Sequence, residues 1–178
     1  MTILVIGGSG SGKSEYAESC CMALKSEKKI YIATMEPYDE ESFARIARHR
    51  KMRDGKGFET VECYTHLEEL EVPPNCTVLL ECMSNLAANE MFSDAGRKEE
   101  SARAIFAGVE KLAGQADNLV IVSNQVFSDG ITYDEGTQNY LRILGKVNQK
   151  IAEIADIVCE VVHGIPIPVK GTLMELEK

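Results

Sequence analysis

Short runs of apolar and β-branched residues alternate along this chain with longer stretches in which apolar residues recur every three or four positions. The first pattern is typical of buried parallel strands and the second of amphipathic helices. The predicted strands span 2–6, 29–33, 77–80, 119–123 and 157–162, and the predicted helices span 13–24, 40–53, 97–113 and 136–155. This alternation predicts an α/β fold with a mostly parallel sheet and helices on both faces.

Turn-forming residues interrupt this pattern. The predicted loops, each rich in glycine, proline, asparagine or aspartate, span 54–57, 72–75 and 128–136. Pro166 and Pro168 restrict the segment 165–170 to an edge strand, because proline has no N–H to donate to a neighbouring strand. We expect residues 1–170 to form a single domain, followed by a loose or weakly helical C-terminal tail at 171–178.

Composition and charge narrow the classes of partner. Of the 178 residues, 44% are hydrophobic and 26% are charged, which suits one domain with its own core. The formal net charge of -9 disfavours nucleic acid and anionic membrane as partners. No apolar run approaches the roughly 18 residues that a membrane span needs. Met1 is followed by a strand-like run rather than a signal helix, so we expect a cytoplasmic protein whose six cysteines are reduced thiols.

A glycine-rich loop follows the first predicted strand and matches the pattern G-x-x-x-x-G-K-[ST]. Its predicted nucleotide-binding residues are Gly7, Gly8, Ser9, Gly10, Ser11, Gly12, Lys13 and Ser14. Small residues let successive backbone N–H groups converge on one phosphate, and the helix that follows adds its positive end. Lys13 is predicted to act in catalysis by reaching the β and γ phosphates, and Ser14 to ligate Mg²⁺. The domain is therefore predicted to be a P-loop nucleotide-binding domain.

Glu81 directly follows the third predicted strand and is the best candidate for an acid near the metal. It can hold Mg²⁺ together with Ser14 or contact a nucleotide ribose. The alternative is that this carboxylate caps a helix that follows it. The chain lacks an [NT]-K-x-D motif, because the nearest segment, 123–126, reads Ser-Asn-Gln-Val, and this disfavours a regulatory GTPase.

The second predicted helix, with Asp39 as its expected N-cap, is a basic segment in an acidic protein. At 100° per residue, one helix face carries Arg45, His49 and Arg53. The residues predicted to turn toward the core are Phe43, Ile46 and Ala47. A histidine among arginines has a lowered pKa, so its neutral imidazole is available as a nucleophile. The alternative is a solvated charged face on which the histidine is incidental.

An ordered series of short motifs resembles the adenosylcobinamide kinase/adenosylcobinamide-phosphate guanylyltransferase family. The matching segments are 7–14, Tyr31-Ile32-Ala33-Thr34, Arg45-Ile46-x-x-His49-Arg50-x-x-Arg53, Leu79-Leu80-Glu81-Cys82, Val122-Ser123-Asn124, and 145–156. The series covers nearly the whole chain and is more specific than the P-loop motif alone. The resemblance implies a RecA-like P-loop NTPase fold and a domain that acts as a transferase.

The resemblance also implies two activities. The family phosphorylates the aminopropanol hydroxyl of adenosylcobinamide with ATP or GTP, and then transfers GMP from GTP to the product through a guanylyl-histidine, releasing pyrophosphate. His49 matches that catalytic histidine. The further nucleotide contacts that the resemblance implies are Ala33, Thr34, Met35, Arg50, Lys51, Met52, Arg53, Glu62 and Glu81. It also implies a corrinoid substrate, Mg²⁺ and a homotrimer.

Gln125 departs from the family pattern, because glutamate is common at this position. If that glutamate acts in phosphorylation, the kinase activity of this chain is in question. Asp134 or Glu135 is then a candidate for a replacement carboxylate. Two other functions therefore stay open: a small-molecule kinase of one activity without a covalent nucleotide intermediate, and a nucleotide-binding regulatory subunit without turnover. Release of pyrophosphate from GTP would distinguish the bifunctional transferase from both of these alternatives.

Overall fold

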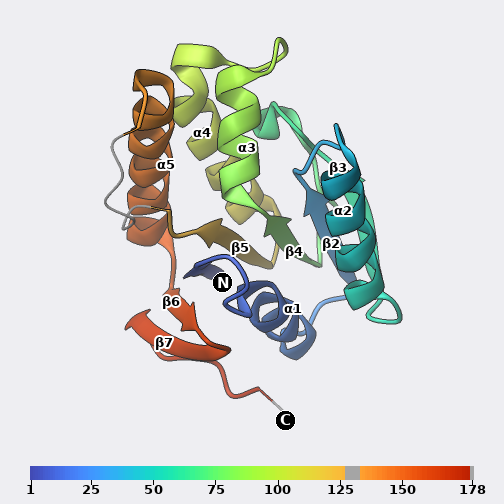
Figure 1. Cartoon of the computed structure of the whole chain (residues 1–178). Helices are drawn as coiled ribbons and strands as arrows, with labels where there is room; N and C mark the ends of the chain where they lie inside the picture. Colours follow the sequence, from blue (N-terminus) through green and yellow to red (C-terminus); the bar gives the residue numbers. More distant parts are fainter. Residues whose placement is uncertain (127–132, 177–178) are drawn as a thin grey trace.

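A single seven-stranded sheet forms the centre of the protein, in a computed structural model that describes residues 1–126 and 133–176. The strands are β1 Thr2–Gly7, β2 Lys28–Ala33, β3 Phe58–Glu62, β4 Cys76–Glu81, β5 Asn118–Asn124, β6 Ile157–Val162 and β7 Ile165–Lys170. Their order is β3-β2-β4-β5-β1-β6-β7, and every neighbouring pair is parallel except β6 and β7 (Figure 1). The predicted mostly parallel sheet and the predicted edge strand at 165–170 are confirmed, and the structure adds that this strand is antiparallel to β6.

Helices cover both faces of this sheet, as predicted. They are α1 Lys13–Ala23, α2 Glu40–Arg53, α3 Met83–Phe92, α4 Ser101–Gln115 and α5 Glu135–Ile154, with 3-10 turns η1 Leu67–Glu69 and η2 Lys98–Glu100. Helices α3, α4 and α5 lie together on one face, and α1 lies on the other (Figure 1). Successive side chains of a strand point to opposite faces. Leu4 of β1 therefore joins the core beneath α3–α5, whereas Ile3 and Val5 join the core beneath α1.

Two elements are absent from the sequence-based prediction. Strand β3 has no clear signal because its sequence, FETVE, is short, mostly polar and largely exposed at the sheet edge. Helix α3 has none because Asn89 and Glu90 are buried along with its apolar residues, so no polar face marks it as amphipathic. Its N-cap is Cys82, so the helix-capping alternative for Glu81 is wrong. The helix predicted at 97–113 begins later, at Ser101, after the turn η2.

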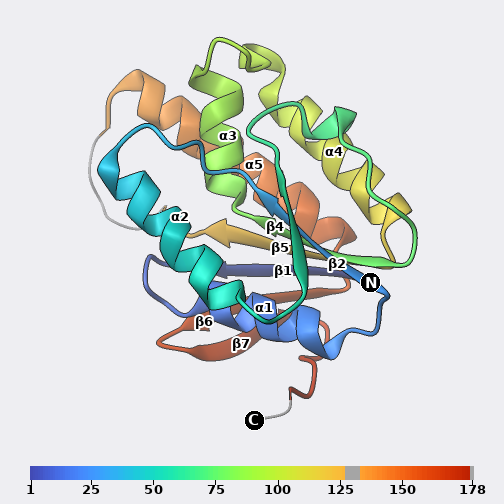
Figure 2. The same ribbon diagram turned by 90° about the vertical axis from the view of Figure 1, so that its right-hand side faces the viewer.

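Helix α2 has the predicted N-cap but not the predicted core face. Asp39 accepts a hydrogen bond from the Ser42 backbone N–H at 2.8 Å, in a capping box. Ala47 is exposed, and Phe43 is 59% exposed, so the prediction that these residues turn to the core is wrong. The reason is the position of the helix, which lies outside the layer of α3, α4 and α5 (Figures 1 and 2).

Residues 172–176 of the C-terminal segment have no regular secondary structure. Its apolar side chains, Leu173, Met174 and Leu176, pack against the core beneath α1. The predicted loops at 54–57 and 72–75 are confirmed, while the predicted loop at 128–136 includes residues 128–132, which lie outside the described residues. All six cysteines are free and buried. Among the described residues, no helix is long and apolar enough to cross a membrane.

Candidate active site

The carboxyl ends of five parallel strands meet at one edge of the sheet and frame a cavity. The residues that end these strands are Gly7, Ala33, Glu62, Glu81 and Asn124. Four of them line a cavity of about 390 Å³ together with the P-loop and the inner side of α2. Ligands of open α/β sheets bind outside the carboxyl ends of the strands, so this is the expected location for a substrate. We call it the nucleotide cavity.

The P-loop has the geometry of an anion site. Gly12 has a φ of 92°, and a Cβ at this position would lie 3.1 Å from the Gly164 Cα, so glycine is required here. Helix α1 begins at the next residue, Lys13, and its N-terminal end faces the cavity. The Lys13 Nζ donates to the Gly8 carbonyl at 3.1 Å. Burial lowers the pKa of Lys13, an effect that Cys82 and Glu81 oppose.

The Glu81 carboxylate joins the P-loop helix to the histidine of α2. Its Oε1 accepts the Ser14 hydroxyl hydrogen bond, and the same oxygen lies 3.6 Å from the His49 Nδ1. Its Oε2 is buried and has no hydrogen-bond partner among the described residues. A hydroxyl beside a carboxylate with a free oxygen suits Mg²⁺. In the described part of the chain, no group of three or more histidine, cysteine or acidic side chains is arranged so that it could hold a metal ion.

His49 is largely enclosed in this cavity. Its side chain is 15% exposed, and its Nδ1 faces Glu81 without reaching hydrogen-bond distance. Burial is the main cause that lowers the pKa of His49, with Arg48 and Arg53 adding to it and Glu81 opposing it. The neighbouring arginines therefore lower the pKa of His49, as predicted, although desolvation of the imidazole lowers it more. In a neutral imidazole with Nδ1–H toward Glu81, the lone pair is on Nε2.

Two contacts hold the C-terminal end of α2 and the turn after it, one against β2 and one against the P-loop helix. The Arg53 guanidinium carbon lies 3.3 Å from the centre of the Tyr31 ring on β2. The Lys56 Nζ lies 2.6 Å from a carboxylate oxygen of Glu18, a fully buried residue of α1. Lys56 lies in the turn directly after α2, so this ion pair connects the end of the helix that carries His49 to the helix that carries Lys13 and Ser14.

Most of the predicted site residues line the nucleotide cavity. They are Ser9, Gly10, Ser11, Gly12, Lys13, Ser14, Ala33, Met35, His49, Arg50, Met52, Arg53, Glu62 and Glu81. The P-loop motif and the family resemblance proposed these positions for one site, although they span more than 70 residues of sequence.

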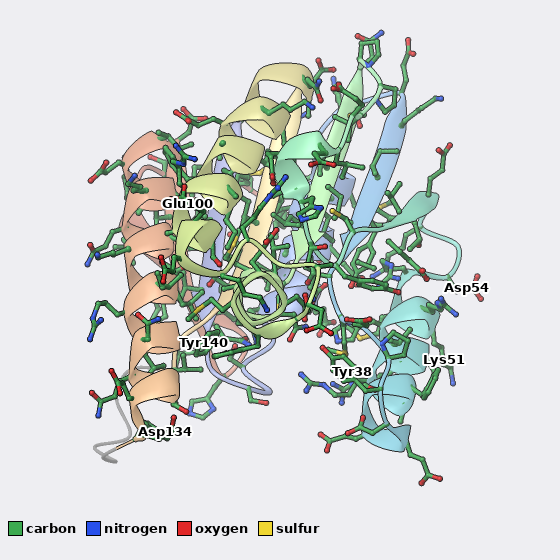
Figure 3. All side chains as sticks on the ribbon, turned by 90° about the horizontal axis from the view of Figure 1, so that it is seen from above. Tyr38, Lys51, Asp54, Glu100, Asp134 and Tyr140 are labelled. Atoms are coloured by element: carbon green, nitrogen blue, oxygen red, sulfur yellow. The ribbon has the colours of Figure 1, made fainter. Side chains whose placement is uncertain are left out.

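Four predicted nucleotide contacts do not line the cavity: Gly7, Gly8, Thr34 and Lys51. Gly7 ends β1, where a Cβ would lie 2.8 Å from the Val161 carbonyl oxygen. Thr34 is fully buried, and its hydroxyl bridges to the backbone of Cys82. Lys51 is on the outer side of α2 (Figure 3). These residues shape the backbone around the cavity or face away from it.

Two arginines of the basic helix that the sequence proposed for binding phosphate, Arg45 and Arg48, also line the cavity. Sequence reasoning did not assign site roles to four other lining residues: Tyr31, Tyr64, Asn85 and Asn124. The end of the strand at 119–123 was a usable signal for Asn124, because neighbouring strand ends lie at the same edge. Asn85 has no such signal, since it reaches the cavity only through the packing of α3. Gln125 does not line the cavity; its backbone N–H donates to the Gly7 carbonyl at 3.1 Å.

A family of known proteins matches residues 3–169 of this chain, and its description is cobinamide kinase/cobinamide phosphate guanyltransferase. The chain belongs to this family. Its relatives in the cobinamide kinase/cobinamide phosphate guanyltransferase family include the bifunctional adenosylcobalamin biosynthesis protein CobU of Escherichia coli strain K12, which is 35% identical over 96% of this chain and 100% of that protein. The Salmonella typhimurium protein of the same name is 32% identical over the same shares. The Pseudomonas aeruginosa CobP protein is 29% identical over 96% of this chain.

Solved structures support the fold of this family member. An ATPase from a bacterial type III secretion system matches 89% of the chain with a TM-score of 0.55 and 11% identity. The chain spans 50% of that protein. A second solved ATPase domain also matches 89% of the chain, with a TM-score of 0.50 and again 11% identity. At this identity the likeness concerns the fold alone, and the predicted RecA-like P-loop fold is confirmed.

Proposed function

We propose that this protein phosphorylates adenosylcobinamide with ATP or GTP and then transfers GMP from GTP to adenosylcobinamide phosphate. The products of the second reaction are adenosylcobinamide-GDP and pyrophosphate. Membership of the cobinamide kinase/cobinamide phosphate guanyltransferase family over residues 3–169 supports both activities. Relatives named as bifunctional support them further.

One observation carries the covalent mechanism: His49 lines the same cavity as the P-loop, beside Glu81. A histidine that served only as a surface charge would have no reason to be enclosed at 15% exposure with Nδ1 against a carboxylate. Glu81 orients the ring and stabilises the positive charge that develops on it. This pairing supports His49 as the nucleophile.

The guanylyl transfer then takes two displacements at one phosphorus. The Nε2 lone pair of His49 forms a bond to the α-phosphorus of GTP, and the bond from that phosphorus to the β-bridging oxygen breaks, releasing pyrophosphate. A phosphate oxygen of adenosylcobinamide phosphate next bonds to the same phosphorus, and the P–N bond breaks to restore His49. Lys13, Arg48 and Arg53 line the cavity and would stabilise the charge on the transferring group.

The kinase step needs positioning and charge more than a base, because the transition state of phosphoryl transfer is loose. Lys13 and the backbone N–H groups of the P-loop would orient the γ-phosphoryl group toward the acceptor hydroxyl. Gln125 lies outside the cavity lining, so we do not expect the replacement of the family's common glutamate at this position to impair phosphorylation. Asp134 acts as the N-cap of α5, accepting from the Thr137 N–H at 3.0 Å, and is not proposed as a replacement base.

Ser14 and Glu81 are the residues that would hold Mg²⁺. Bound there, the ion would neutralise phosphate charge. The free Glu81 Oε2 supports this assignment, since a buried carboxylate oxygen without a partner is costly unless a ligand satisfies it.

The proposed mechanism is tested by intact mass of the purified protein after incubation with GTP and Mg²⁺. The expected result is an acid-labile adduct of the mass of GMP in the native protein and none in His49→Asn. An adduct that persists in His49→Asn would exclude His49 as the nucleophile. A native protein that binds GTP but forms no adduct and releases no pyrophosphate would support a kinase of one activity.

We also propose that the chain forms a homotrimer. Strand β7 is an edge of the sheet and exposes Ile165 at 65% and Val169 at 67%. Exposed apolar side chains on an edge strand support association, because they otherwise remain in contact with water. Light scattering coupled to size-exclusion chromatography tests this; a mass equal to one chain would exclude it.

A further inference from the structure

A second cavity of about 300 Å³ adjoins the nucleotide cavity. It lies between the segment 35–42, which leads into α2, and one side of α3. Met35, Arg45 and Asn85 line both cavities and form the boundary between them. We call the second one the side cavity. A molecule bound in it can therefore extend into the space where the phosphates of a nucleotide would lie.

The wall of the side cavity is held by hydrogen bonds and is already formed. The Asn89 side chain donates to the Thr34 carbonyl at 2.8 Å and to the Tyr64 carbonyl at 2.9 Å, and it accepts from the Tyr38 hydroxyl at 3.1 Å. Tyr38 lies on the inner side of α2, toward α3 (Figure 3). Because all these groups satisfy one another, the wall can bind a ligand without rearranging.

The charge of the side cavity does not suit a triphosphate. Glu36, Asp39 and Glu41 line it, and Arg45 at the boundary is the one cation among the described residues of its lining. Carboxylates repel phosphate, whereas they accept hydrogen bonds from the N–H groups of amides. A corrinoid carries primary carboxamides around its ring and an amide-linked aminopropanol arm. The lining is therefore complementary to the acceptor rather than to the nucleotide.

Two polar side chains at the boundary between the cavities are available to bind a ligand. Asn85 is half-buried, and its side chain makes no hydrogen bond to another described residue. Arg45 forms no ion pair within the described ranges 1–126 and 133–176. An amide can bind a hydroxyl or an amide, and a guanidinium binds phosphate in a bidentate manner. Both groups are thus suited to the end of the arm, which carries a hydroxyl before the kinase step and a phosphate after it.

We propose that the side cavity binds the aminopropanol arm of the corrinoid and the carboxamides beside it, while the ring remains outside. Asn85 and Arg45 direct the end of the arm into the nucleotide cavity, toward the γ-phosphoryl group in the first reaction and toward guanylylated His49 in the second. This assignment rests on the proposed function.

The test uses the two half-reactions of guanylyl transfer, because the first needs no corrinoid. Ala88 is a half-buried residue of α3 that lines only the side cavity, so Ala88→Phe fills it. The matched control is Ala107→Phe, an exposed position on α4 outside both cavities. For each variant we would measure formation of the GMP adduct with GTP and Mg²⁺, and then KM for adenosylcobinamide phosphate in the transfer reaction.

The expected result for Ala88→Phe is adduct formation within about twofold of the native rate and a KM for adenosylcobinamide phosphate raised at least about tenfold. Ala107→Phe should match the native protein in both. An unchanged KM in Ala88→Phe would overturn the proposal. So would an equal loss of adduct formation and transfer, since the cavity would then belong to the nucleotide.

A second variant guards against misfolding of the first. Glu36→Ala removes a half-buried carboxylate that lines only the side cavity, without filling space. It is expected to raise KM for the acceptor by about tenfold while adduct formation persists. A native protein that forms no adduct would refute the histidine mechanism but not the side cavity. In that case KM for adenosylcobinamide in the kinase reaction decides, and an unchanged value in both variants overturns the proposal.

Discussion

The imidazole of His49 and the carboxylate of Glu81 face each other, with Nδ1 3.6 Å from Oε1. The same oxygen accepts the hydrogen bond of Ser14 at the start of the P-loop helix. One side chain thus contacts the nucleophile of the proposed guanylyl transfer and a proposed ligand of the metal. Both proposed reactions should therefore depend on this carboxylate.

Glu81→Gln keeps the shape of the side chain and removes its charge. We expect it to lower both the kinase and the guanylyl transfer rates by about 10²-fold, because the imidazolium and the metal each lose their anionic partner. Single-turnover rates with GTP check this. Glu59→Gln, an exposed carboxylate of β3, is the control and should be neutral. A loss in only one activity would show that Glu81 serves a single role.

The ion pair between Lys56 and Glu18 should contribute to stability and to the position of His49. Lys56→Met leaves a fully buried carboxylate without its cation and is expected to cost about 2 kcal/mol, less than for a fully buried pair because Lys56 is 33% exposed. Urea unfolding measures this cost. The double variant Glu18→Met with Lys56→Met should regain most of the stability but not the native rate of adduct formation. Equal costs for single and double variants would contradict this account.

Gly12 and Gly114 offer a matched pair of glycine substitutions. Gly12→Ala should abolish nucleotide binding, because its φ of 92° and the 3.1 Å approach to Gly164 both exclude a Cβ. Gly114→Ala in α4 should instead stabilise the protein by about 0.5–1 kcal/mol, since a Cβ there meets no atom within 4 Å. Titration calorimetry with GTP and thermal unfolding separate the two effects. Nucleotide binding retained in Gly12→Ala would be inconsistent with the geometry of the loop.

Gln125→Glu restores the residue that is common in the family. Because Gln125 lies outside the cavity lining and is exposed, we expect a change of less than about twofold in the rate of adenosylcobinamide phosphorylation. Steady-state kinase assays with ATP and with GTP check this. A gain of tenfold or more would mean that position 125 approaches the phosphates when substrates are bound.

The sequence by itself determined the parts of this protein that depend on local pattern. The P-loop, the N-cap at Asp39 and the five internal strands were predictable, because motif spacing, capping preference and the burial of parallel strands each favour particular residue types at neighbouring positions. Resemblance of ordered motifs also brought His49 and Glu81 into one proposed site.

Only the tertiary structure decided how distant residues meet. It places Glu81 against both Ser14 and His49, buries Arg53 on the Tyr31 ring, and leaves Phe43 of the same helix exposed. Helical periodicity assigned Phe43 to a core face. Periodicity separates the apolar side of a helix from its polar side, but it does not show which other elements pack against the apolar side. The side cavity likewise arises between α3, which the pattern did not reveal, and the segment 35–42 that leads into α2. Such sites depend on packing between segments far apart in sequence, and no local pattern encodes that contact.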